Sequence, residues 1–206
     1  MTQTWRERMK SLMGVDAMVK DLVETLIDTG QMSHTYIVFA SDNGFLLYQH
    51  RLYSKGFPYE ESQGIPLVVR GPGVRRGVVS QQLVANIDLA PTIAEWAGIQ
   101  PPAYVDGRSL VPLLEDTATS WRGYLLFEYF LSGHPYVGVR TAVGESYIEY
   151  EDGEKEYYDL RVDPWQLRNA SADPHNAERL AQLSQILSAL KDCEGAGCRA
   201  ADGGGP

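Results

Sequence analysis

Apolar residues near the start of the chain recur every three or four positions, which is the spacing of one face of an α-helix. These residues are Leu12, Val15, Val19, Leu22 and Leu26. Charged residues take the other directions of the helical wheel, and a glycine at position 30 stands where a C-terminal cap is expected. The pattern predicts an amphipathic helix of roughly five turns.

The next apolar residues form two short continuous runs. Residues 35–40 read Thr-Tyr-Ile-Val-Phe-Ala, and residues 65–70 read Ile-Pro-Leu-Val-Val-Arg. Such runs are typical of strands that are buried on both faces of a parallel sheet. Asp88 and Pro91 mark the start of a compact helix that should end before Gly98. Together these elements predict an α/β fold with a mainly parallel, helix-flanked sheet.

From about Trp121 the pattern changes to aromatic-rich runs separated by glycine-containing turns, which favours an antiparallel sheet. The runs cover residues 124–130, 136–143, 147–150 and 156–160. Leucines at helical spacing then predict a last helix over 177–191. The chain therefore divides into an α/β part (1–120), a small antiparallel subdomain with a packed helix (121–192) and a flexible tail rich in glycine and alanine (193–206).

Charge and composition narrow the set of partners. The 206 residues carry a formal net charge of −9, whereas nucleic acids and anionic membranes bind to basic surfaces, so neither is an expected partner. No apolar run approaches the ~20 residues of a membrane span. The first ten residues lack the pattern of a signal peptide, so the localisation stays open, and a full-length form could be exported. Cys193 and Cys198 could form a small disulfide or stay reduced.

Two candidate ligands of a cation directly follow the first apolar run. Asp42 offers a carboxylate and Asn43 an amide oxygen at the carboxyl end of the predicted strand, where open α/β sheets bind ligands. Both are hard oxygen donors that suit calcium or magnesium. The alternative is a simple turn, because the sequence Asp-Asn-Gly also favours one.

Lys55 and His50 could act on an anionic substrate. Lys55 lies in a loop shaped by glycine and proline and could reach an anion, although a lone lysine is more commonly a solvated surface charge. His50 precedes Arg51, and such a pair in a loop is either a hydrogen-bonded structural feature or part of a catalytic site. We favour the structural interpretation of His50.

The order and spacing of these segments resemble the sulfatase family of the alkaline phosphatase superfamily. The matching segments are 35–44, 49–52, 55–56, 59–61, 66–73, 88–92, 106–110 and 158–164. The resemblance implies that residues 1–120 are the C-terminal part of the family's catalytic α/β domain and that residues 121–192 are its C-terminal antiparallel subdomain. It also implies a calcium ion held partly by Asp42 and Asn43, and contact between Lys55 and the sulfate of a sulfate ester substrate.

The family's nucleophile is a formylglycine made from the first residue of a Cys/Ser-x-Pro/Ala-x-Arg motif. Neither Cys193 nor Cys198 nor any serine begins this motif, and the adjacent Asp-Asp pair that supplies further metal ligands is also missing from these 206 residues. The chain alone is therefore expected to be inactive as a sulfuric ester hydrolase. Formylglycine and a complete calcium site are expected only in a full-length form, whose N-terminal part is a candidate partner.

Two alternative functions stay open. One is a phosphoester or phosphonate hydrolase of the same superfamily, because sulfate and phosphate esters share tetrahedral geometry and metal-assisted displacement. The other is a non-catalytic, sulfatase-derived binding protein. The natural substrate would depend on pocket residues that the matching segments do not contain.

Overall fold

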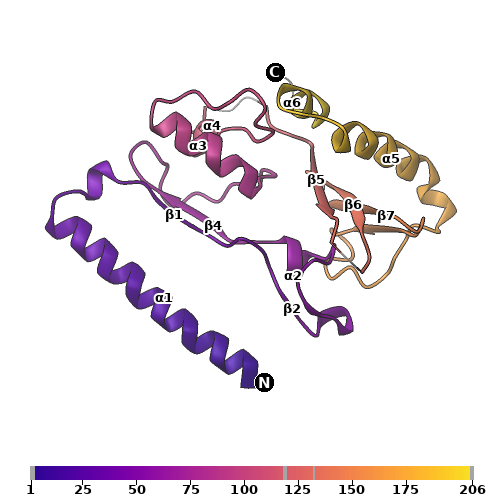
Figure 1. Ribbon diagram of the computed structural model, residues 1–206, viewed down its shortest axis with the longest axis horizontal. Helices are drawn as coiled ribbons and strands as arrows, with labels where there is room; N and C mark the ends of the chain where they lie inside the picture. Colours follow the sequence, from indigo (N-terminus) through magenta and orange to yellow (C-terminus); the bar gives the residue numbers. More distant parts are fainter. Residues whose placement is uncertain (1–2, 118–119, 132, 205–206) are drawn as a thin grey trace.

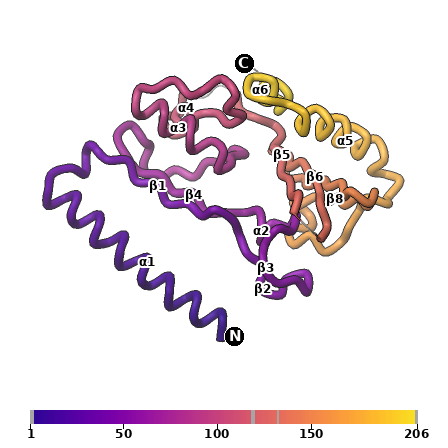
Figure 2. The backbone as a smooth tube through the Cα atoms, in the orientation of Figure 1, coloured from indigo at the N-terminus to yellow at the C-terminus, as the bar shows by residue number. Residues whose placement is uncertain are grey.

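The computed structural model describes residues 3–117, 120–131 and 133–204. A long helix lies at one side, an α/β part occupies the middle, and an antiparallel sheet with two helices forms the other side (Figure 1). The backbone tube shows the long helix diverging from the rest of the chain along most of its length (Figure 2). Among the helices of these ranges, none has the length and apolar character that crossing a membrane requires.

Helix α1 spans Gln3–Asp28 and is longer than the sequence pattern predicts. Gly30 has a positive φ of 71°, as expected for a residue that follows a helix end. None of the 26 residues of α1 is buried. One contact with the rest of the chain is made by Arg8, whose guanidinium carbon lies 4.5 Å from the centre of the Phe45 ring. The predicted helix is confirmed, but its apolar face is largely uncovered.

Strands β1 (Ile37–Ala40) and β4 (Leu67–Arg70) form from the two predicted runs and pair antiparallel. The expectation that both faces of these strands are buried is wrong, because Val38 is 36% and Val68 is 61% exposed. The α/β class is confirmed. The mainly parallel sheet stays a prediction, since every strand pair within the described residues is antiparallel.

Short elements between β1 and β4 shape the loops of the candidate site. They are β2 (Leu46–Leu47), the 3₁₀ turn η2 (Gln49–Arg51), β3 (Tyr53–Ser54) and helix α2 (Glu60–Gln63). β2 and β3 pair as a small hairpin. The chain thus returns to α2 before it enters β4.

Helical segments that follow β4 lie on one side of the small β1–β4 sheet (Figure 1). They are the 3₁₀ turn η3 (Asn86–Asp88), α3 (Leu89–Trp96) and α4 (Val111–Leu114), while η1 (Met32–His34) leads into β1. The ring of Trp96 stacks on that of Tyr36 with 4.0 Å between ring centres. This contact fixes α3 against the start of β1, as predicted for a helix that flanks the sheet.

The C-terminal sheet is an antiparallel meander of four strands in sequence order. Its strands are β5 (Tyr124–Tyr129), β6 (Tyr136–Thr141), β7 (Glu145–Tyr150) and β8 (Lys155–Asp159), followed by η4 (Pro174–Asn176) and α5 (Ala177–Lys191). Leu183, Leu187 and Leu190 of α5 pack against one face, where Val139 and Tyr147 are buried. The predicted antiparallel sheet and its packed helix are confirmed.

The other face of this sheet supports α2. Tyr136, Ile148 and Tyr158 form a buried cluster, and Tyr59, the residue before α2, packs against it. The Tyr59 hydroxyl donates a hydrogen bond to Glu156 across 3.3 Å. Burial and the Glu156 charge raise the pKa of Tyr59 to about 12, so the phenol stays neutral at physiological pH. The antiparallel subdomain therefore forms the base on which the α2 segment lies.

The described residues of the predicted tail contain regular structure. Cys193 and Cys198 form a disulfide, and helix α6 covers Ala196–Ala201. Asp202, which is 6% exposed, accepts hydrogen bonds from the Arg108 guanidinium at 2.6 and 2.7 Å. A glycine- and alanine-rich composition gave no sign of this order, because the ordering comes from charge pairing with a residue 94 positions away.

A buried charge network continues from Asp202 into the α/β part. Arg122, which is 2% exposed, pairs with the fully buried Asp88 at 2.5 Å, and its Nε lies 3.7 Å from Asp202. Asp88 also accepts a backbone hydrogen bond from Arg108 at 2.9 Å. Two carboxylates and two guanidinium groups thus join the end of the chain to the start of α3.

Candidate functional site

The structure brings together two of the residues singled out in the sequence. Asn43 follows β1, and Lys55 follows β3, twelve residues later. The Lys55 ammonium donates a hydrogen bond to the Asn43 side-chain oxygen across 2.9 Å. The β2–β3 hairpin causes this meeting, because it folds the chain back so that the two loops lie next to each other.

Asp42 and Asn43 offer part of a site for a divalent cation. One Asp42 carboxylate oxygen accepts the Asn43 backbone N–H at 2.9 Å, and the exposed side chain still has a second oxygen to offer. The Asn43 oxygen would bind either a cation or Lys55. Calcium takes six to eight oxygen ligands, so these two donors fit as a fraction of its coordination shell.

His50 contacts Tyr59 and Glu61, at the start of the α2 segment. Its ring stacks on Tyr59 with 3.9 Å between centres, and its Nε2 lies 3.4 Å from a Glu61 carboxylate oxygen. The side chain is only 10% exposed, and the backbone has a positive φ of 50°. These are contacts that hold a ring in place, which agrees with the structural interpretation, and the role of His50 stays a prediction.

A cavity of about 770 Å³ opens beside Lys55. Besides the predicted site residues, its lining includes Glu60 and Gln63 of α2 and Tyr129, Tyr136 and Arg140 of the C-terminal sheet. Arg140 Nη1 lies 3.2 Å from Glu60. Burial lowers the pKa of Arg140, the Glu60 carboxylate opposes that shift, and the guanidinium remains cationic at neutral pH. Arg140 thus lines the cavity as a cation that is paired with Glu60.

Sequence reasoning missed Arg140, because its strand reads as an ordinary aromatic-rich run. The direction of an arginine on a strand depends on register, which only the pairing of β6 with its neighbours decides. In the structure Arg140 lies opposite Leu125 on one side and Ser146 on the other. The sequence offered one weak signal that Arg140 faces a site, which is that this arginine alternates with apolar residues along its strand.

The C-terminal sheet also touches the lysine loop directly. Gly56 has a φ of 87°, and a Cβ at this position would lie 2.6 Å from the Tyr129 ring. Only glycine tolerates both the conformation and the close ring. The residue after Lys55 is therefore pressed against an aromatic side chain of β5.

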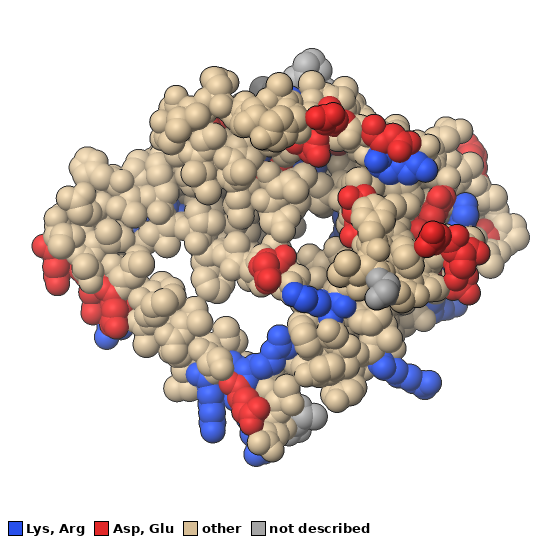
Figure 3. Space-filling view, in the orientation of Figure 1, with Lys and Arg blue, Asp and Glu red and all other residues tan. Residues whose placement is uncertain are grey.

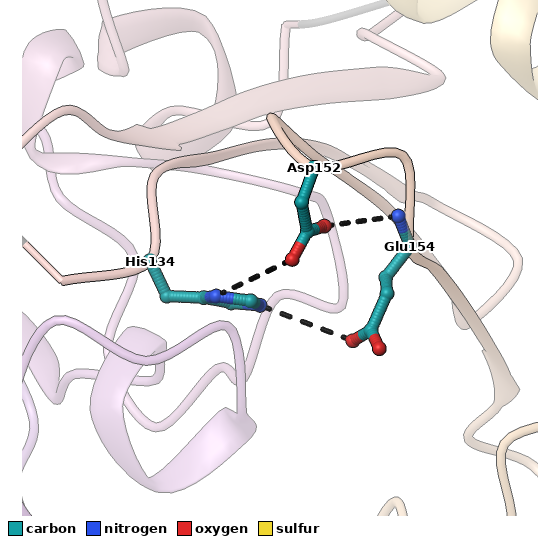
Figure 4. A group of neighbouring side chains, drawn as sticks. All are labelled: His134, Asp152 and Glu154. Atoms are coloured by element: carbon teal, nitrogen blue, oxygen red, sulfur yellow. Dashed lines mark hydrogen bonds and ion pairs between the residues drawn. The ribbon is translucent and has the colours of Figure 1, made fainter.

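A separate cluster of His134, Asp152 and Glu154 lies on the surface of the C-terminal subdomain (Figure 4). The two ring nitrogens face different carboxylates, with 3.8 Å to Asp152 and 4.0 Å to Glu154. The two carboxylates therefore lie at different edges of the ring, and a metal ion bound to one ring nitrogen would leave the other nitrogen with its own carboxylate. All three side chains are exposed, so we interpret the cluster as contacts between surface side chains.

Comparisons with known proteins agree on one family. Residues 48–193 match the family model described as N-sulphoglucosamine sulphohydrolase, C-terminal. The chain is 32% identical to an N-acetylglucosamine-6-O-sulfatase from Bacteroides thetaiotaomicron over 195 residues, which cover 90% of this chain and 35% of the relative.

Solved structures with the same fold include a protein in complex with its substrate D-glucosamine-2-N,6-O-disulfate. Its TM-score is 0.83 at 30% identity, over 93% of this chain and 40% of the other. A phosphonate monoester hydrolase from Silicibacter pomeroyi matches with a TM-score of 0.78 and 30% identity, over 86% of this chain and 38% of the other. The chain thus spans about two fifths of the length of each of these neighbours.

Proposed function

Since this chain belongs to the N-sulphoglucosamine sulphohydrolase C-terminal family of the sulfatases, we propose that it forms the C-terminal part of a hydrolase of sulfate esters. The observation that carries the proposal is that Lys55 lies 2.9 Å from the Asn43 oxygen at a cavity lined by Asp42, Asn43 and Lys55. With a divalent metal on the Asn43 oxygen, the Lys55 ammonium would be released to an oxygen of a sulfate group beside the metal.

The proposed roles follow from the charges of the site. Lys55 binds a non-bridging oxygen of the sulfate, and Asp42 and Asn43 supply two oxygen ligands of a calcium ion. When bound, the calcium ion would neutralise negative charge that develops on the sulfate oxygens during displacement. Lys55 would add to this by holding the sulfate in one orientation, because its ammonium group attracts the anion.

We infer that the substrate is a sulfated glucosamine. Two of the proteins named above, the Bacteroides thetaiotaomicron sulfatase and the neighbour in complex with its substrate, act on or bind sulfated glucosamine derivatives. The cavity beside Lys55 carries aromatic rings together with basic and acidic side chains, which suit a sugar that has hydroxyl groups as well as an anionic group. These features support a carbohydrate substrate over a small aryl sulfate.

Turnover requires residues outside these 206. Because the nucleophile motif is missing, Lys55 and the metal ligands would stabilise a displacement that this chain cannot begin. The candidate partner is the N-terminal part of the same enzyme, which would supply the formylglycine and the remaining calcium ligands. The exposed apolar residues of α1 and β1 are the surface on which that part would pack.

Binding of a sulfated sugar to the purified chain tests the proposal. We expect calorimetry with calcium present to show tighter binding of D-glucosamine 6-sulfate than of D-glucosamine. Lys55→Ala should remove the difference, whereas Lys20→Ala, a change of an exposed lysine on α1, should keep it. Equal binding of the two sugars would contradict the proposed site. Turnover of an aryl sulfate that is lost in Lys55→Ala would contradict the inactivity of the chain alone.

A second candidate is hydrolysis of phosphonate monoesters, which the similarity to the Silicibacter pomeroyi enzyme favours. The same lysine and calcium ligands would contact a tetrahedral phosphonate instead of a sulfate. Competition distinguishes the two functions. If phenyl phosphonate displaces D-glucosamine 6-sulfate at a much lower concentration than sulfate does, the phosphonate function is preferred.

A further inference from the structure

Ser62, a residue of α2, contacts both loops of the candidate site. Its hydroxyl oxygen accepts the backbone N–H groups of Gly56 at 3.1 Å and Phe57 at 3.4 Å. Its backbone carbonyl accepts the N–H of Gly44 at 2.9 Å. Gly56 directly follows Lys55 and Gly44 directly follows Asn43. One residue therefore fixes the neighbours of both partners in the Lys55–Asn43 contact.

Because Ser62 is buried, its hydrogen bonds hold the two loops in fixed positions. The residue is 5% exposed, so water cannot easily replace its hydroxyl as an acceptor for the loop. A Cβ at Gly44 would clash with the carbonyl of Glu61, which shows how closely the Asn43 loop approaches α2. Both loops thus lie directly against the same four-residue helix.

Helix α2 is in turn anchored to the C-terminal sheet. The Glu60 carboxylate pairs with Arg140, and the Glu60 backbone N–H donates to the Gln166 side chain at 2.7 Å. Gln63 donates to the Tyr136 hydroxyl at 2.9 Å. These contacts span 73 to 106 positions along the chain. The antiparallel subdomain therefore holds the helix that holds the site loops.

We propose that Ser62 is a positioning residue, which sets the distance between Lys55 and Asn43 through its hydrogen bonds to the two loops. The role of these two residues in binding sulfate and calcium rests on the function proposed above, but the positioning itself does not. Without the Ser62 hydroxyl, the Gly56 and Phe57 N–H groups lose their acceptor. The lysine loop then samples several positions, and the Lys55 ammonium spends less time at Asn43.

Chemical cross-linking measures this distance without any ligand. In an Asn43→Asp chain, a water-soluble carbodiimide can join the new carboxylate to the Lys55 amine, and peptide mass spectrometry measures the yield. We expect Ser62→Ala in the same background to lower the yield about fivefold, the effect of losing a hydrogen bond. Ser62→Thr, which keeps the hydroxyl, should restore it. The chain with native Asn43 reports any background coupling to Asp42.

Ser184→Ala is the matched control, because Ser184 on α5 also donates a side-chain hydrogen bond, to Glu149 at 2.7 Å. It should leave the cross-link yield unchanged. Amide hydrogen exchange is a second measurement. It remains informative even if the larger threonine of Ser62→Thr does not fit the buried site. Ser62→Ala should speed exchange at Gly56 and Phe57 but spare Gly44, whose acceptor is the backbone carbonyl.

The outcomes separate this inference from the proposed function. An unchanged cross-link yield in Ser62→Ala, or equal acceleration of exchange at all three amides, would overturn the positioning role. A lowered yield with selective exchange at Gly56 and Phe57 supports it, even if the chain fails to bind D-glucosamine 6-sulfate. If the sulfated sugar does bind, Ser62→Ala should weaken its binding about fivefold, and Ser184→Ala should not change it.

Discussion

Helices α1 and α5 both carry apolar residues at helical spacing, yet they lie in opposite surroundings. Leu183, Leu187 and Leu190 of α5 are at most 3% exposed, whereas Leu12 and Leu22 of α1 are 51% and 47% exposed. The difference in exposure comes from the elements that pack against each helix, because both helices carry an apolar face. α5 lies on a four-stranded sheet of the same subdomain, and α1 has no comparable sheet among the described residues.

The strands show the same contrast. The C-terminal meander buries residues on both of its faces, one under α5 and one under the α2 segment. The β1–β4 pair leaves Val38, Phe39 and Val68 exposed. Two strands alone bury too little apolar area to be stable. The C-terminal subdomain thus completes its own core, while the N-terminal region leaves apolar side chains uncovered.

The space around α1 also distinguishes the loosely packed N-terminal region from the C-terminal subdomain. The space-filling view shows α1 separated from the rest by gaps, while the C-terminal subdomain is closely filled, with acidic and basic side chains intermixed on its surface (Figure 3). A region that has completed its packing keeps charges outside and apolar groups inside. Substitutions should therefore have large effects in one region and small effects in the other.

The largest effect is expected from Leu187→Ala. Leu187 is 1% exposed in the core beneath the C-terminal sheet, so truncation leaves a cavity and should lower the free energy of unfolding by about 2–5 kcal/mol. Leu12→Ala on α1 is the matched comparison and should change it by less than about 0.5 kcal/mol. Urea unfolding followed by tyrosine fluorescence measures both. Similar losses would show that α1 is packed as tightly as α5.

The second largest loss of stability is expected from the charge network that joins Asp202 to Arg108. Asp202→Asn removes the carboxylate that pairs with Arg108, and the half-satisfied guanidinium should cost about 1.5–3 kcal/mol. Asp192→Asn, an exposed change on the same segment, should have almost no effect. Differential scanning calorimetry measures both variants. A melting temperature of Asp202→Asn equal to that of the unaltered chain would contradict the pairing.

The disulfide should contribute a similar or smaller amount to the free energy of unfolding. Replacing Cys193 and Cys198 by alanine opens a short loop and should destabilise the chain by about 2 kcal/mol. The loss should appear as faster hydrogen exchange in α6, with α1 unchanged. Equal exchange in α6 with and without the disulfide would mean that the Asp202 pairing alone holds the segment.

Glu145 should make the C-terminal region sensitive to acid. Burial would raise the pKa of Glu145, but hydrogen bonds and charge from Arg179 hold it below the usual 4.5. Because the folded pKa is lowered, this stabilisation is complete above pH 4.5 and is lost as the pH falls through the lowered value. Melting temperatures from pH 7 to 3 should fall less steeply in Glu145→Gln. An identical slope would show that other carboxylates dominate.

The smallest effect is expected on the surface of α1. Lys20 and Glu24 form an ion pair at 3.7 Å with both side chains more than half exposed. Water screens such a pair, so Lys20→Ala should change the free energy of unfolding by less than about 0.5 kcal/mol. Chemical unfolding at low and high salt measures it. A larger loss at low salt would indicate that α1 carries more of the stability than its exposure suggests.

The candidate site residues came from the resemblance to the sulfatases rather than from their residue types. Asp42 and Asn43 by themselves also fit a turn, and Lys55 by itself also fits a surface charge, so their roles in binding stay predictions. Ser62 and Arg140 were not among these candidates. Their importance depends on which segments meet at α2, and those contacts join residues up to 106 positions apart.

The periodicity of the sequence alone determined the elements: the helices over α1, α3 and α5, the strands of the C-terminal meander, and the change of architecture near Trp121. Helical and strand spacing are properties of a few neighbouring residues, so a linear pattern records them. Tertiary structure decided the rest, including the exposed faces of β1, the ordered segment around Asp202 and the Lys55–Asn43 contact. Burial and charge pairing depend on residues that are distant along the chain, and no local pattern records which of them will meet.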